Sequence, residues 1–152
     1  MQIDSSDRHI LRLLQADAGR SNQDLAAETG LSAAQIWRRI EKMERAGVIA
    51  GREITLSPAA LGYPLEVSLR ITLDKTRPRA FDEFLAAARA VPQVDMIQTL
   101  LGSVDLRLSV RARDLADYQR IYREEILSLP HLAEVEALMS VADVKRSEAL
   151  PL

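Results

Sequence analysis

A run of nitrogen-bearing side chains lies between residues 35 and 45 of this 152-residue chain. If this part of the chain is helical, at 100° per residue, Gln35, Arg38 and Lys42 fall together on one face. Arg39 and Arg45 flank that face. Cations gathered in this way can neutralise phosphates, and Arg and Gln can also bond the edges of guanine and adenine. The opposite face is apolar and contains Ile36, Ile40 and Met43.

Two helices and a tight turn would present this face. Ser21 can cap a helix that ends at Gly30, and Ser32 can cap the next helix, which ends near Gly47. This pattern is typical of a helix-turn-helix, whose second helix enters the major groove of DNA. Small residues at the start of that helix would let its backbone approach the duplex closely. The expected DNA contacts are Ser21, Ser32, Ala33, Ala34, Gln35, Arg38, Arg39, Lys42 and Arg45.

Elements on either side complete a predicted domain over residues 1–56. Asp4 or Ser5 can cap a first helix that runs through Ala16. After the third helix, the segment from Val48 to Ala50 and the segment from Arg52 to Leu56 could pair around Gly51 as a small hairpin. Three short helices followed by such a hairpin predict a winged helix-turn-helix. Trp37 is expected to pack at the edge of the third helix, with contact to DNA or a partner as the alternative.

The second half of the chain changes its pattern after a linker at 57–64, which is rich in Pro, Gly and Ser. Residues 65–73 alternate between apolar and polar, which predicts a half-buried strand. We expect a helix at 78–90 next, with Phe81, Phe84, Leu85 and Ala88 facing inward. It is followed by strands at 94–101 and 104–110, a helix capped by Asp114 and a last strand within 131–144. This β-α-β-β-α-β order predicts a ferredoxin-like domain over 65–152, so the fold class is α+β. Arg111 and Arg113 are expected in a solvated loop.

Composition excludes several classes of function. The chain has no cysteine and two widely spaced histidines, so we expect no metal site and no cofactor. It contains no phosphate-binding loop and no nucleophile-elbow motif, which argues against an enzyme. No apolar run approaches a membrane span and the start is unlike a signal peptide, so a cytoplasmic protein without a membrane partner is expected.

Charge limits how strongly one such domain can hold DNA. The net charge of the chain is −2, and residues 1–62 carry equal numbers of acidic and basic side chains. Any basic surface is therefore narrow, and we expect modest affinity per domain, raised by dimerisation. For an isolated helix the alternative is a solvated face laced with Glu–Arg pairs. Three helices in the right order favour DNA binding over that alternative.

The chain resembles the Lrp/AsnC family of transcriptional regulators over almost its whole length. The family pattern L-S-x-x-x-V/C-x-x-R-V-x-x-L-E-x-x-G-V-I is matched by Leu31-Ser32, Ile36, Arg39-Ile40, Met43-Glu44 and Gly47-Val48-Ile49. The opening and the second half match as well, through Ile3-Asp4, Asp7, Ile10-Leu11, Leu14, Ser21, Leu25-Ala26, Gly102-x-x-Asp105, Leu129-Pro130 and Val144-Lys145.

This resemblance implies homo-oligomers and an effector. Family members pair through their βαββαβ sheets into dimers, which often form tetramers or octamers, and many bind an amino acid at the loop with the Gly-x-x-Asp pattern. Here apolar residues, Val135 and Ala137, stand where the family has two threonines. The effector is therefore more apolar or bound differently, or the loop is simply a hairpin turn. The expected effector site is Leu101, Gly102, Ser103, Asp105, Val135 and Ala137.

The resulting hypothesis is a sequence-specific, homo-oligomeric transcriptional regulator that binds a pseudo-palindromic operator and responds to an amino acid or a related small metabolite. Two alternatives stay open. One is an effector-independent architectural protein of the nucleoid type, which binds DNA by charge and shape. The other is a small dimeric ferredoxin-like protein that binds a metabolite or acts as an enzyme.

Overall fold

The chain divides into two units, which we describe separately. The computed structural model describes residues 2–142, 144–145 and 149–152. One unit comprises Met1–Thr55 together with Lys145–Leu152, and the other comprises Leu56–Val144. The C-terminal tail therefore groups with the first unit, whereas the sequence placed it in the second domain. Gln15 accounts for part of this grouping, because its side-chain amide pairs with the backbone of Leu150 in both directions, at 2.6 and 3.3 Å.

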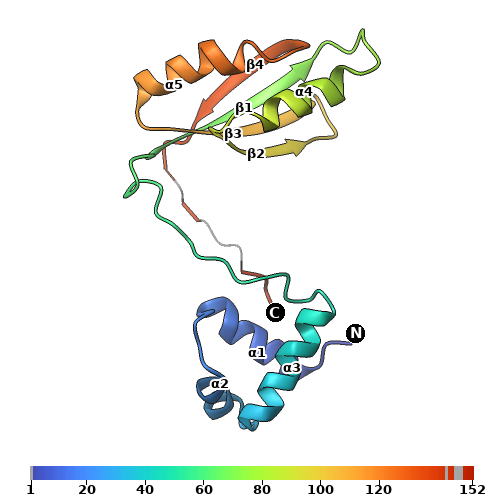
Figure 1. Ribbon diagram of the computed structural model, residues 1–152, viewed down its shortest axis with the longest axis vertical. Coiled ribbons are helices and arrows are strands. Elements are labelled where there is room, and N and C mark those ends of the chain that lie inside the picture. Colours follow the sequence, from blue (N-terminus) through green and yellow to red (C-terminus); the bar gives the residue numbers. More distant parts are fainter. Residues whose placement is uncertain (1, 143, 146–148) are drawn as a thin grey trace. The chain divides into compact units, whose positions relative to one another are not determined.

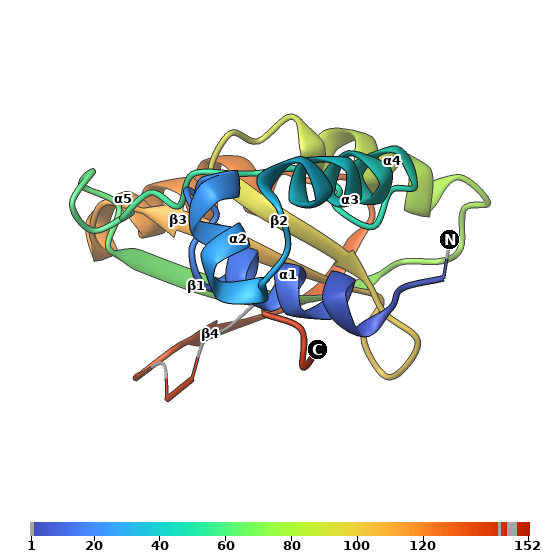
Figure 2. The same ribbon diagram turned by 90° about the horizontal axis from the view of Figure 1, so that it is seen from below.

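Three helices form the first unit: α1 (Ser5–Ala16), α2 (Asn22–Thr29) and α3 (Ala33–Arg45) (Figure 2). Each begins with a capping box, in which a side-chain oxygen accepts from a backbone amide of the first turn. Gly30 ends α2 with φ of 72°, a left-handed conformation that glycine adopts without strain. The apolar stripes of the three helices meet in a core made of Ile10, Leu25, Ile36, Ile40 and Met43.

The prediction of a hairpin after α3 is wrong. Residues 46–64 are all described, and no strand lies among them. Ile49 packs against the core of the first unit, but Ile54 and Leu56 are 85% and 61% exposed. An isolated two-stranded hairpin is marginal in water, and these residues bury too little apolar surface to stabilise one. The three helices nonetheless follow one another in the predicted order.

A four-stranded antiparallel sheet forms the second unit. Its strands are β1 (Leu65–Leu73), β2 (Val94–Thr99), β3 (Leu106–Ala112) and β4 (Leu132–Met139), in the spatial order β2-β3-β1-β4. Helices α4 (Ala80–Arg89) and α5 (Leu115–Ile121) lie on the same side of the sheet, and α5 continues as a π-helical turn, η1 (Tyr122–Ile126) (Figure 1). The predicted β-α-β-β-α-β order is therefore confirmed. Asp143, which falls in the predicted last strand, lies outside the described residues.

The core of the second unit lies between the sheet and its helices. Val67, Leu69 and Ile71 of β1 alternate into this core, as the sequence predicted. On α4 the predicted inward positions of Phe84, Leu85 and Ala88 are confirmed, but in the first turn Ala80 and not Phe81 is buried. Phe81, one residue and 100° further, is 38% exposed.

Candidate DNA-binding surface and effector site

The exposed face of α3 carries two cations that the first unit does not use. Arg38 and Lys42 are exposed, and among the residues that the structure describes neither forms an ion pair. Within the described part of the chain, the Arg38 guanidinium makes one hydrogen bond, from Nε to the Ala34 carbonyl one turn back, at 3.3 Å. Its terminal nitrogens thus keep their donors for another molecule. The buried residues Ile36, Ile40 and Met43 lie on the other side of the helix, as predicted.

Arg39 differs from these two cations because it is bound within its own unit. Its Nη1 lies 2.8 Å from an oxygen of Asp4 and 2.7 Å from an oxygen of Asp7. The Asp7 side chain is only 4% exposed. The pKa of Asp4 lies below its ordinary value, first because the Asp7 amide donates to its carboxylate and then because of Arg39. Arg39 was predicted to contact DNA, and the structure places its guanidinium in this internal contact.

The other predicted contacts are exposed but partly engaged in caps. Gln35 accepts from the Ser32 amide at 2.8 Å through its carbonyl oxygen, which leaves the amide nitrogen free to donate. Ser21 caps α2, and its hydroxyl donates to Asp24 at 2.6 Å. Arg45 pairs with Glu41 at 2.6 Å, but its side chain is 76% exposed, so this pair is weak. Ser32 and Ala34 are exposed, and Ala33 is half-buried.

Trp37 is more exposed than the sequence suggested. We expected it to pack at the edge of α3, but 54% of the residue is accessible. It lies on the flank of the helix, between the core face and the face of Arg38. The chain has one tryptophan, so its fluorescence reports on α3 alone.

In the second unit, Asp105 joins two elements at one end of the sheet. Its carboxylate accepts from the Leu73 amide at 3.0 Å and lies 2.6 Å from Lys75 Nζ. These contacts hold the pKa of Asp105 below its ordinary value, the Leu73 amide having the larger effect. The only carboxylate of the predicted effector site therefore already faces a cation. Lys75 is 70% exposed in its side chain, so an ammonium group could replace it.

The rest of the predicted effector site surrounds this end of the sheet. The Asp105 amide donates to the Ile71 carbonyl at 2.9 Å, and Ile71 pairs with Val135 of β4 on its other side. Ala137 pairs with Leu69, two residues further along. Leu101 is fully exposed, and its neighbours Gly102 and Ser103 are also exposed.

Glycine at 102 is not required by the local fold. Its φ lies outside the left-handed region, and a Cβ built there would meet no atom within 4 Å. A side chain at this position would thus cost the isolated fold little. Absence of a side chain instead suits the close approach of another molecule to the backbone.

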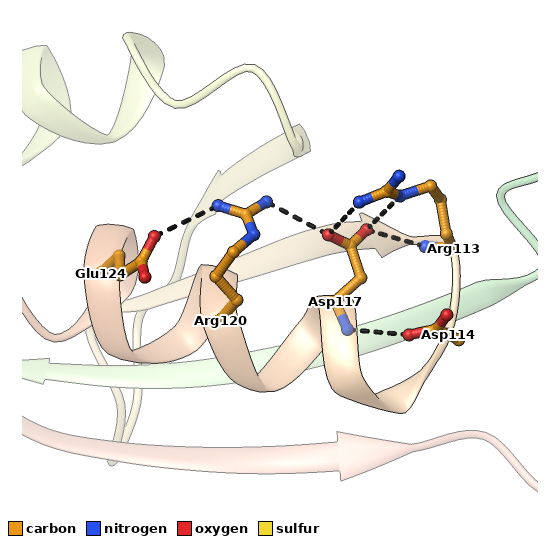
Figure 3. A network of polar contacts seen from close by, with 5 residues as sticks. All are labelled: Arg113, Asp114, Asp117, Arg120 and Glu124. Atoms are coloured by element: carbon orange, nitrogen blue, oxygen red, sulfur yellow. Dashed lines mark hydrogen bonds and ion pairs between the residues drawn. The ribbon is translucent and has the colours of Figure 1, made fainter.

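A network of ion pairs fixes the start of α5, and the expectation of a solvated loop holds for Arg113 but not for Arg111. Arg113 and Arg120 both contact the Asp117 carboxylate, which also accepts from the Arg113 amide (Figure 3). The side-chain hydrogen bonds from Arg113 are the main reason that the pKa of Asp117 lies far below its ordinary value. Arg111 lies in β3, within 2.8 Å of both Glu66 and Asp95. Arg111 is therefore not in a loop, because strand pairing brings it against two carboxylates that the local sequence does not reveal. Arg113 does lie in an exposed bend between β3 and α5, as predicted, but Asp117 holds its guanidinium there.

Two general searches cover the part of the chain that the structure describes. Within it, no three His, Cys, Asp or Glu side chains come together as metal ligands would. No helix within the same residues is both long and apolar enough to cross a membrane.

Both units match models of known protein families. Residues 3–50 match a family model described as winged helix-turn-helix DNA-binding, and residues 66–150 match one described as the Lrp/AsnC ligand binding domain. The second match covers more than half of the chain. The chain belongs to the Lrp/AsnC family. Members of this family are DNA-binding transcriptional regulators, and this chain is one of them.

Individual Lrp/AsnC relatives match over nearly the full length. The proline dehydrogenase transcriptional activator of Rhodobacter capsulatus is 36% identical over 142 residues, 93% of this chain and 92% of the relative. The leucine-responsive regulatory protein of Haemophilus influenzae is 33% identical, over 99% of this chain and 90% of its own. A transcriptional regulator of Neisseria meningitidis, solved as a complex with L-Met, has a TM-score of 0.91 at 25% identity, covering 99% and 97% of the two chains.

Proposed function

We propose that this Lrp/AsnC regulator reads a pseudo-palindromic operator with the exposed face of α3, as a homo-oligomer, and that an amino acid or related metabolite modulates it. Arg38 and Lys42 supply the charge on that face, and Gln35 supplies an amide donor. Ser32, Ala33 and Ala34 let the start of the helix approach the duplex. Ser21 and Arg45 are further candidates from the adjoining surface.

One observation carries this proposal. Arg38 and Lys42 are exposed cations that the described part of the chain does not pair, one turn apart on the face opposite the core of the first unit. Other cations of the first unit, such as Arg39, Arg45 and Arg20, have carboxylate partners. Unpaired cations on a helix are what counterion release from DNA phosphates requires.

A gel-shift assay of the purified protein with its own upstream DNA tests the proposal. We expect a specific complex that survives an excess of unrelated DNA and weakens as salt rises from about 50 to about 200 mM. Scrambled DNA of the same composition is the control. A complex that forms equally on scrambled DNA, with steep loss in salt, would instead identify an architectural protein.

Assembly into oligomers is supported by the second unit. The side of the sheet away from its helices carries an inter-strand polar network, with bonds from Arg107 to Ser68 and from Arg111 to Glu66. We infer that this face meets the same face of a second copy, since homo-oligomers are mostly built on two-fold contacts. Two DNA-binding units then read two half-sites about one helical turn, or a multiple of it, apart.

An effector site at Asp105 is supported by three features of that end of the sheet. Leu101 exposes its whole side chain, Gly102 leaves its backbone open, and Asp105 presents a carboxylate that an ammonium group suits. Val135 and Ala137 add apolar surface where polar groups would hold a more polar ligand. An amino acid with an apolar side chain fits this chemistry best, and L-Met is bound by the solved Neisseria relative.

A thermal-shift screen of the amino acids checks the effector. A ligand of the native state, present at about 100 times its dissociation constant, stabilises it by about 2.7 kcal/mol. This corresponds to a rise in Tm on the order of 10 °C for a domain of this size. The variant Gly102→Ala should keep the ligand-free Tm and lose most of the rise. An equal rise in the variant would move the effector to another site.

A further inference from the structure

The start of α1 is closed by two carboxylates that face each other. In its capping box, Asp4 accepts from the Asp7 amide at 2.8 Å and Asp7 accepts from the Asp4 amide at 3.2 Å. The usual box combines Ser or Thr with Glu or Gln, so that at most one partner is charged. The two negative carboxylates repel each other. This repulsion is costly because Asp7 is buried, with 3% of the residue exposed.

Arg39 supplies the missing positive charge from another helix. A single nitrogen, Nη1, bridges the second oxygens of Asp4 and Asp7 at 2.8 and 2.7 Å. All four carboxylate oxygens thereby accept a hydrogen bond, two from the backbone and two from Arg39. We call Asp4, Asp7 and Arg39 the α1–α3 clamp. It joins residues 32 and 35 positions apart in the chain.

The clamp and the free cations share one hollow. Asp4, Asp7 and Arg39 line a polar pocket of about 360 Å³ together with Gln35, Arg38 and Lys42. Arg39 is the neighbour of Arg38 along α3, about 100° around the helix. A rotation of α3 that breaks the clamp would therefore turn Arg38 and Lys42 by the same angle.

We propose that Arg39 is a positioning residue, which holds α3 against the start of α1 and so fixes the direction in which Arg38 and Lys42 meet DNA, without contacting DNA itself. This inference rests on the proposed DNA-binding face. It gives Asp4 and Asp7 a role in DNA binding although both are anions. Whether removal of one of these anions weakens or strengthens DNA binding distinguishes this proposal from an effect of charge alone.

The decisive variant is Asp7→Asn. Removing an anion from a DNA-binding unit strengthens binding if charge alone matters. The clamp predicts the opposite, roughly tenfold weaker binding to the operator, or about 1.4 kcal/mol. Binding of the full-length protein is measured by fluorescence anisotropy of labelled operator DNA. Emission from Trp37 and the Tm are measured alongside, to show that the variant is folded.

Variants of Arg39 test the same point from the other helix. Arg39→Met should bind roughly tenfold more weakly with an unchanged dependence on salt, whereas loss of a phosphate contact lowers the salt slope by about 1 per copy. Arg39→Lys keeps one nitrogen that can lie between the two carboxylates, so it should bind more tightly than Arg39→Met.

Three results would overturn the inference: a reduced salt slope in Arg39→Met, no advantage of lysine over methionine, or Asp7→Asn binding at least as tightly as the wild type. If Arg39→Met fails to fold, the affinity of Asp7→Asn for the operator still decides whether the inference holds. Failure of the wild-type protein to bind its operator would instead refute the proposed function.

Discussion

Replacing Arg38 and Lys42 together by alanine is expected to weaken operator binding at least about 100-fold, or about 2.8 kcal/mol. An arginine that reads a guanine contributes about 1–3 kcal/mol, and a lysine on a phosphate contributes through counterion release. A dimer loses each contact twice. The salt slope should also fall by about 1 per copy for every phosphate contact that is removed. Anisotropy titrations at several salt concentrations measure both quantities.

A charge-matched variant controls for the change in net charge. Arg89 and Arg123 are exposed cations of the second unit, on α4 and η1, so Arg89→Ala with Arg123→Ala removes two positive charges from outside the DNA-binding unit. This control should bind within about threefold of the wild type, since both charges lie outside the DNA-binding unit and are exposed to screening by salt. Equal losses in the two double variants would mean that Arg38 and Lys42 act only through net charge. Wild-type binding by Arg38→Ala/Lys42→Ala would refute the assigned face.

The helices of the first unit could be predicted because their signals are local. Ser21 and Ser32 lie directly before helices that they cap, and Gly30 supplies the left-handed turn between them. The apolar stripe of α3 was equally readable, since its spacing is set by helix geometry alone. The strand at 65–73 was predicted with its observed bounds, because strict alternation of apolar and polar residues indicates a half-buried strand.

The parts that the sequence did not reveal depend on contacts between distant residues. Arg39 and Arg38 are the same residue type in adjacent positions, and only the approach of α1 separates an internal ion pair from a free cation. Lys75 beside Asp105 was missed for the same reason. The D-x-x-D spacing of Asp4 and Asp7 is a readable signal for a capping box, and its two negative charges indicate that a cation lies nearby, but the sequence does not show which one.

The two phenylalanines of the chain should respond very differently to truncation. Phe84 is fully buried against the sheet, so Phe84→Ala should lower the free energy of unfolding of the second unit by about 3–5 kcal/mol. Phe81 lies three residues earlier and is 38% exposed, so Phe81→Ala should cost less than about 1 kcal/mol. The sequence assigned both rings to the core, and this pair of variants decides between that expectation and the structure.

The chain carries its own probes for this measurement. All three tyrosines, Tyr63, Tyr118 and Tyr122, belong to the second unit, whereas Trp37 belongs to the first. In urea, at fixed protein concentration, Phe84→Ala should shift the tyrosine near-UV circular dichroism transition and leave the Trp37 fluorescence transition in place. A coincident shift of both signals would mean that the units unfold as one. A large shift in Phe81→Ala would mean that this ring is covered in solution, as contact with a second copy would do.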